Sequence, residues 1–183
     1  MRRTCSVRRR KTYSACLRGL VAVLAVSLAA CTARSSVADS GSARLADREA
    51  IEATLERYTR GLDRLDPQLY LSSFAPNGVL MIYQTRHQGP DALRNIIAGE
   101  LRLRQSQQDS GLPPRMLFHL ETNSIIEFTS AVHAQHRAYW LTASRAGDKP
   151  EGLTLLGVGS SSDELQKIDG KWLITRREIR AQP

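Results

Sequence analysis

Apolar residues are spaced as in an α-helix from Asp47 to Leu65. They recur every three or four positions, which predicts one buried face of an amphipathic helix. Asp47 is the expected N-cap, and Asp66-Pro67 is expected to end this helix and begin a short second one over residues 67–74. The apolar positions of the first helix are Ile51, Leu55, Tyr58, Leu62 and Leu65.

A third helix and several strands are predicted from the rest of the chain. The helix begins at Gly89-Pro90-Asp91 and is followed by a polar loop over residues 105–114. Strands are expected after an Asn77-Gly78 turn and throughout the C-terminal part, where Asp169-Gly170 is typical of a two-residue hairpin. The strand ranges are 79–83, 116–128, 131–144, 152–167 and 171–180. Helices first and long strands afterwards predict an α+β domain, with helices on one face of a curved antiparallel sheet.

The first 31 residues have the pattern of an export signal. Residues 1–30 contain seven Lys and Arg residues and no acidic residue, and residues 19–30 are apolar except for Ser27. This apolar run is too short to cross a bilayer as a structural helix, so we interpret it as a removable signal peptide. Leu28-Ala29-Ala30-Cys31 resembles the bacterial lipobox, in which the chain is cut before the cysteine and the cysteine is lipidated. Ordinary signal cleavage is the alternative, because small residues precede both kinds of cut.

We therefore expect three segments along the chain. They are a signal peptide over residues 1–30, a lipidated Cys31 with a small, polar tether over residues 31–44, and one domain over residues 45–183. The lipid would anchor the protein to a membrane of the cell envelope. Thr32 follows Cys31, whereas Asp at this position favours inner-membrane retention in Gram-negative lipoproteins. We therefore expect the lipid to anchor the protein in the outer membrane, with the domain facing the periplasm. The sequence does not distinguish between the Sec and twin-arginine export routes.

Most of the excess charge and all the cysteines belong to the leader. The whole chain has a net charge of +8, but 19 basic residues face 18 acidic ones beyond residue 30. The domain therefore has no net positive field that would favour nucleic acid as a partner. The cysteines are Cys5, Cys16 and Cys31, so the domain can form neither a disulfide nor a thiolate metal site.

The order of several segments resembles the SnoaL-like branch of the nuclear transport factor 2-like superfamily. They are Tyr58 and Asp63 late in the first helix, then YLSSFAPNGVL, HQGPDALRNII and DGKWLITRREI, starting at residues 70, 87 and 169. The resemblance implies a cone-shaped roll, in which a strongly bent sheet wraps around helices and encloses an apolar cavity. It also implies a homodimer through the outer face of the sheet. Members include lyases, isomerases, cyclases, dehydratases and non-catalytic binding proteins, so the fold alone does not select a function.

Asp63 and His119 are the candidate catalytic residues. In family members resembling scytalone dehydratase and the hexachlorocyclohexane dehydrochlorinase, an Asp at the former position orients a His at the latter, which acts as a general base. A carboxylate that accepts one imidazole N–H fixes the tautomer and leaves the other nitrogen basic. Each residue also has a non-catalytic interpretation when it is considered alone. Asp63 would be a solvated acid at a helix end, and His119 would be a hydrogen-bonded residue of the core.

Five further residues are candidates to bind a ligand in the cavity: Tyr58, Tyr83, Phe118, Asn123 and Trp140. The Tyr58 hydroxyl would polarise a substrate oxygen. Asn123 falls four residues after His119, where family members often carry a polar group. For the aromatic residues, packing in the core is the simpler alternative.

The remaining histidines and glycines indicate no metal and no cofactor. His133 and His136 are three residues apart on a predicted strand, so their side chains are expected on opposite faces. Gly157 and Gly159 lie inside a predicted strand with no helix after it. They are expected to permit bending or close packing of the sheet rather than to bind phosphate.

Two classes of function remain open from the sequence. The first is a cofactor-free lyase or isomerase that acts on a small apolar molecule through Asp63 and His119. The second is a non-catalytic envelope lipoprotein that binds a ligand or a partner protein with the same cone. A cluster of charges, Arg176, Arg177 and Arg180, is interpreted as the solvated surface of an edge strand and favours neither class.

Overall fold

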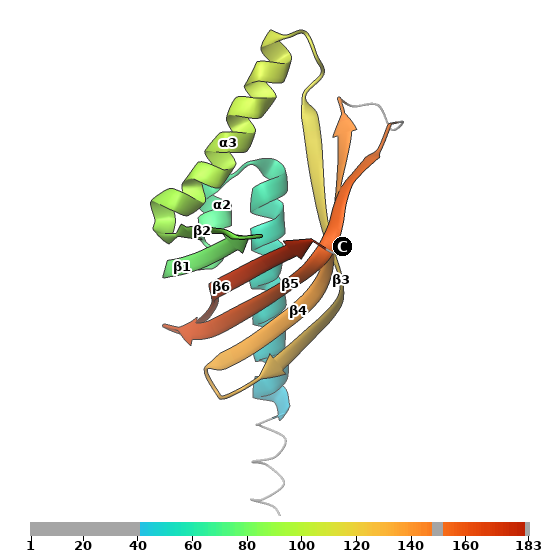
Figure 1. Cartoon of the computed structure of the whole chain (residues 1–183). Helices are drawn as coiled ribbons and strands as arrows, with labels where there is room; N and C mark the ends of the chain where they lie inside the picture. Colours follow the sequence, from blue (N-terminus) through green and yellow to red (C-terminus); the bar gives the residue numbers. More distant parts are fainter. Residues whose placement is uncertain (1–40, 148–151, 182–183) are drawn as a thin grey trace, which may run out of the picture. The chain divides into compact units, whose positions relative to one another are not determined.

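The helical and strand-like halves of the sequence form separate layers in a computed structural model, which describes residues 41–147 and 152–181 (Figure 1). Residues 41–64 are helical and are called the first helix below. The elements after it are α2 (Pro67–Leu71), β1 (Phe74–Ile82), β2 (Thr85–Gln88), α3 (Gly89–Asp109), β3 (Arg115–Phe128), β4 (His133–Ala146), β5 (Thr154–Ile168) and β6 (Lys171–Ala181). The described residues from Ala46 onward belong to one compact unit. The expected signal peptide, Cys31 and most of the tether lie outside the described residues.

The first helix buries the face that its apolar spacing predicts. Ile51, Leu55, Tyr58, Leu62 and Leu65 are all less than a tenth exposed. Asp47 does not cap this helix, because residues 41–46 before it are already helical. Its carboxylate instead accepts hydrogen bonds from Lys167 Nζ at 2.6 Å and Trp172 Nε1 at 2.9 Å. The role of Asp47 is therefore a tertiary contact with β5 and β6, which the local sequence pattern does not show.

The expected break between the first two helices lies at Asp66. Its carboxylate accepts hydrogen bonds from the backbone N–H groups of Gln68 and Leu69, and Pro67 follows as the first residue of α2. This is an N-cap with proline in the first turn, as the sequence predicts. The turn brings α2 against the first helix at Gly61, where an added Cβ would lie 2.5 Å from the Tyr70 nitrogen.

The sheet has six strands in the order β2-β1-β6-β5-β4-β3. β3 to β6 form an antiparallel meander, and the long strands β3, β4 and β5 bend along their length (Figure 1). The predicted α+β class with a curved sheet is confirmed, but the sheet is mixed rather than wholly antiparallel. β6 returns from the meander to pair with β1 in the same direction, because α3 carries the chain from β2 to β3 at the far edge.

Three local predictions differ from the structure. Asn77-Gly78 lies inside β1 at a register shift between Phe74 and Val79, rather than in a turn before the strand. The short strand β2 was not expected. α3 continues to Asp109 through residues predicted as loop, and a hydrogen bond of 2.8 Å from Gln105 Nε2 to Asp109 Oδ1 joins side chains in its polar last turn.

The core lies between the first helix and the sheet. Tyr58, Tyr70 and Phe74 form a cluster with ring centroids 5.3–5.8 Å apart. Trp172 on β6 packs edge-on against Phe128 of β3. This core fixes the first helix over the sheet and so positions the last turns of the helix beside β3. No helix in the described ranges has both the length and the apolar character needed to cross a membrane.

Candidate functional site

A cavity of about 280 Å³ opens between the end of the first helix and the sheet. Apolar side chains supply most of its walls, and a few polar groups converge in it, which is the usual composition of a small-molecule site. The apolar residues include Leu62, Ile82, Trp140, Leu156 and Ile179. The polar residues include Tyr58, His119, Glu121, Thr142 and Arg177.

His119 lines this cavity, and Asp63 contacts His119 without being among the lining residues. Asp63 Oδ1 accepts a hydrogen bond from the His119 backbone nitrogen at 3.0 Å and lies 2.6 Å from His119 Nδ1. About a quarter of each side chain is exposed. Because a carboxylate only accepts hydrogen bonds, Nδ1 carries the proton and Nε2 is left as the basic nitrogen of a neutral imidazole. The second bond, to the backbone, ties the carboxylate to the same residue whose ring it orients.

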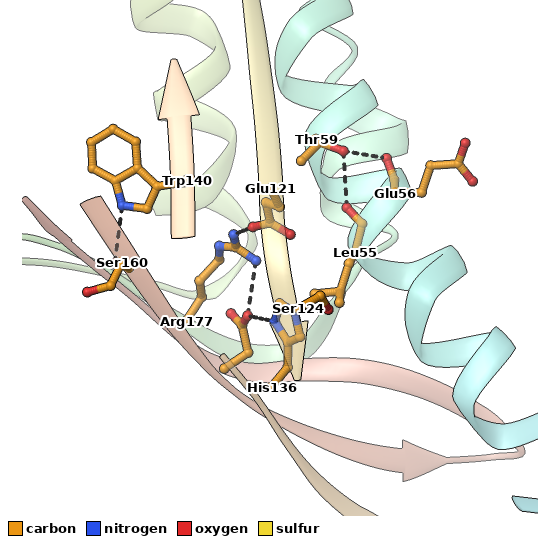
Figure 2. Close-up of polar contacts among 10 residues, drawn as sticks. Leu55, Glu56, Thr59, Glu121, Ser124, His136, Trp140, Ser160 and Arg177 are labelled. Atoms are coloured by element: carbon orange, nitrogen blue, oxygen red, sulfur yellow. Dashed lines mark hydrogen bonds and ion pairs between the residues drawn. The ribbon is translucent and has the colours of Figure 1, made fainter. Parts of the chain in front are cut away.

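Arg177 lies at the base of the cavity and is only 1% exposed. The expectation that it belongs to a solvated edge strand is wrong, because β6 lies between β1 and β5. Its Nη1 donates to Asp163 Oδ2 at 3.2 Å, its Nη2 pairs with Glu121, and its guanidinium stacks 4.1 Å from the centroid of the Tyr58 ring. Figure 2 shows the Arg177 guanidinium beside Glu121. Burial lowers the pKa of Arg177, and the neighbouring Tyr58 opposes that shift.

Two carboxylates therefore surround one buried cation. Burial raises the pKa of Asp163, while its hydrogen bond to His136 lowers it. Of these three residues, Glu121 and Arg177 line the cavity. Burial also raises the pKa of Tyr58, so its phenol stays protonated at neutral pH. Because both Nη atoms of Arg177 already pair with carboxylates, Arg177 is poorly suited to bind an anionic ligand.

Trp140 forms a wall of the cavity. Its indole ring packs over β5, where Gly159 has no side chain to occupy that space. A Cβ added to Gly159 on β5 would lie 2.5 Å from the indole ring and 2.0 Å from the Arg180 carbonyl oxygen. The expectation that this glycine permits close packing is confirmed. The Trp140 Nε1–H donates to the Ser160 carbonyl oxygen at 3.1 Å, which holds the ring flat on the sheet (Figure 2).

The structure gathers only part of the predicted ligand set. Tyr58, Tyr83 and Trp140 line the cavity, with Tyr83 more than half exposed. Phe118 does not, because it precedes His119 on a strand and so projects from the other face, where the Arg145 guanidinium lies 5.6 Å from its ring centroid. Asn123 does not either, because β3 has a register shift at this residue. It lines a second hollow, on the outer face of the sheet.

Sequence reasoning missed the buried polar residues Glu121, His136, Asp163 and Arg177. The position of Glu121 could have been predicted, because it lies two residues after His119 on a strand and therefore shares its face. The other three come from three different strands, and their contact depends on the register of the sheet. His136 is fully buried and His133 is exposed. Within the described ranges, no three His, Cys, Asp or Glu side chains are grouped so as to hold a metal ion.

The sequence matches the family model of the SnoaL-like domain over residues 43–178. The chain belongs to this family. Comparison of the SnoaL-like chain with curated protein sequences finds no match.

Solved structures with the same fold include proteins of different descriptions. A proposed scytalone dehydratase from Novosphingobium aromaticivorans is 24% identical with a TM-score of 0.61, over 78% of this chain and 88% of that one. A LinA-type hexachlorocyclohexane dehydrochlorinase from Novosphingobium barchaimii is 18% identical with a TM-score of 0.61, over 77% and 90%. A cystatin-like protein of unknown function from Nostoc punctiforme is 26% identical with a TM-score of 0.59, over 75% and 92%. These likenesses support the cone fold of the SnoaL-like domain.

Proposed function

We propose that the SnoaL-like domain binds a small, neutral and mostly apolar molecule and abstracts a proton from it, as a cofactor-free lyase or isomerase. The observation that carries the proposal is the double hydrogen bond of Asp63 to His119 at the wall of the cavity. The mostly apolar walls of the cavity, and the pairing of Arg177 with Glu121 and Asp163, favour a neutral ligand over an anion. Similarity to the dehydratase and the dehydrochlorinase described above is consistent with elimination chemistry.

In the proposed reaction His119 Nε2 takes a proton from an activated carbon of the ligand. The electrons of that C–H bond form a double bond. In an isomerase an existing adjacent double bond shifts its electrons onto its far carbon, which takes the proton. In a lyase a leaving group departs from the adjacent carbon with its bonding electrons. Asp63 stabilises the imidazolium through the Nδ1–H bond, and a positioned base of this kind contributes about 10²- to 10⁴-fold of rate.

Hydrogen exchange tests the base without knowledge of the natural ligand. Neutral ketones and halogenated hydrocarbons that stabilise the purified protein thermally are incubated with it in D₂O, and loss of their C–H signals is followed by NMR. We expect exchange or elimination for at least one binder and a fall of about 10²-fold or more in His119→Gln. His133→Gln, which changes an exposed histidine on β4, is the matched control and should retain the wild-type rate.

Three outcomes would contradict this proposal in different ways. Equal turnover in wild type and His119→Gln would remove His119 from the mechanism. Binding without exchange or elimination would favour the alternative, in which the cavity holds a ligand for a non-catalytic envelope protein. If no compound of a broad library raised the unfolding temperature of the protein, a role in binding a partner protein would be the better explanation.

Two proposals concern the place and assembly of the domain. The lipobox-like segment ending at Cys31 supports a lipid anchor in the cell envelope, in the outer membrane facing the periplasm if the cell is Gram-negative. The outer face of the sheet, opposite the first helix, supports a homodimer. It exposes Ile125, Tyr139 and Val158 by 52%, 53% and 45%, and single apolar residues gathered on one sheet face suit contact with a second copy.

A further inference from the structure

Ser124, His136 and Asp163 form a chain of hydrogen bonds apart from the cavity. Ser124 Oγ lies 2.8 Å from His136 Nε2, and His136 Nδ1 lies 2.7 Å from Asp163 Oδ2. The imidazole and the carboxylate are fully buried, whereas Ser124 is exposed. None of the three is among the described residues that line the cavity, although Arg177, which does line it, donates to Asp163. The chain from Ser124 to Asp163 thus shares no residue with the Asp63–His119 pair.

The roles of the ring nitrogens follow from the partners of Asp163. Arg177 can only donate hydrogen bonds, and it donates to the same Asp163 oxygen that contacts His136. That oxygen is therefore an acceptor, and Nδ1 of His136 carries the proton that it accepts. In the neutral imidazole, Nε2 then has its lone pair directed at the Ser124 hydroxyl, which donates to it. A nucleophile hydrogen-bonded to a base, with the base oriented by a third group, is the arrangement of nucleophilic catalysis.

The local backbone aims Ser124 at His136. The register of β3 against β4 shifts by one residue between Thr122 and Ile125. Asn123, within this bulge, has a φ of +54°, which is rare for a residue with a side chain. Bulges redirect side chains, and strained positions of this kind gather at functional sites. β3 is the last strand of the sheet order, so a reactant can approach Ser124 from the open edge.

The contact with Asp163 favours transfer of the Ser124 proton. The Asp163 carboxylate lies 2.7 Å from His136 Nδ1, and both side chains are fully buried. A carboxylate that accepts the Nδ1–H bond of a histidine stabilises the imidazolium that forms when the other nitrogen takes a proton. This stabilisation is strong at low dielectric, because charge interactions there are less screened by water.

We infer that Ser124, His136 and Asp163 form a second catalytic centre, which accepts acyl groups from small activated esters or thioesters. Ser124 Oγ bonds to the carbonyl carbon as its proton passes to His136 Nε2. The C–O or C–S bond to the leaving group then breaks, and the leaving group takes that proton. Water attacks the acyl-serine in the same way and releases the acid.

Acylation of the full-length protein by p-nitrophenyl acetate tests this centre. We expect a burst of about one equivalent of p-nitrophenolate per protein, with the acetyl group found on Ser124 by peptide mass spectrometry. A fluorophosphonate probe should modify the same residue. Ser124→Ala should lose both reactions. In His136→Gln the acylation rate should fall by about 10²-fold or more.

The chain offers a matched control for Ser124. Ser130 Oγ lies 3.1 Å from Nδ1 of the exposed His133, so Ser130→Ala removes a serine that also contacts a histidine. This variant should react as the wild type does. His136 is buried, so its variant can lose the fold, and circular dichroism is therefore recorded for each variant. The result for Ser124→Ala decides the test, because Ser124 is exposed and its substitution should leave the fold intact. A wild type without a burst, label on another residue, or undiminished reaction in folded Ser124→Ala would overturn the inference.

Discussion

Among single residues, Arg177 has the environment least expected from its side chain. Arginine is rarely fully buried unless it is paired, and Arg177 meets that condition with two carboxylates and the face of Tyr58. Its neighbour Arg176 projects from the opposite face of β6, where more than a third of its side chain is exposed beside Glu178. The two adjacent arginines thus differ in environment because successive strand residues face opposite sides of a sheet.

Arg177→Met should therefore destabilise the domain strongly, whereas Arg176→Met should not. Removal of one partner of a buried ion pair leaves charge without compensation and costs about 3–5 kcal/mol. An exposed ion pair contributes about 0–1 kcal/mol, so the matched Arg176 variant should unfold close to the wild type. Urea unfolding followed by circular dichroism measures both. Equal unfolding free energies for the two variants would contradict the buried network.

At the level of elements, the faces of the sheet divide the molecule into two regions. Side chains directed at the first helix form the core and the cavity, and their neighbours on each strand form the outer face. The second hollow, of about 570 Å³, lies on that outer face and is lined by Asn123, Ile125 and Tyr139 among others. A one-residue displacement at the β3 bulge assigns Asn123 to this region instead of the cavity.

If the outer face joins two copies, a charge placed there should separate them. Tyr139→Glu would bury two carboxylates in a symmetric interface, because a two-fold contact uses the same patch twice. We expect a shift from dimer to monomer in analytical ultracentrifugation. Leu101→Glu on α3, a position exposed by 45%, should leave the dimer intact. A monomeric wild type, or a dimer in both variants, would exclude this interface.

For the whole molecule, the segments differ sharply in charge and in chemistry. The basic residues in excess and the cysteines lie before residue 32, and the near-neutral domain follows. A cysteine-free domain needs no oxidative folding step, and its stability rests on the core between the first helix and the sheet. The proposed anchor would hold this domain near a membrane surface without requiring the domain itself to be basic.

The anchor depends on one cysteine, and a second cysteine in the leader provides the control. In a Gram-negative host, Cys31→Ser should abolish labelling by an alkyne analogue of palmitate and release the protein from the membrane fraction. Cys16→Ser should retain both properties, because Cys16 precedes the proposed cut. Fluorescence of the labelled band after gel electrophoresis measures the result. Label that persists in Cys31→Ser would show that the lipobox assignment is wrong.

Local spacing sufficed to predict the α+β class, the buried face of the first helix, the break at Asp66-Pro67 and the family resemblance, because these are properties of neighbouring residues. The family pattern also pointed to Asp63 and His119, whose Oδ1 and Nδ1 atoms lie 2.6 Å apart. The sequence did not predict the central place of β6, the burial of Arg177 or the contacts among Ser124, His136 and Asp163. These features depend on strand order, register and a bulge, which are set by contacts between residues far apart in the chain.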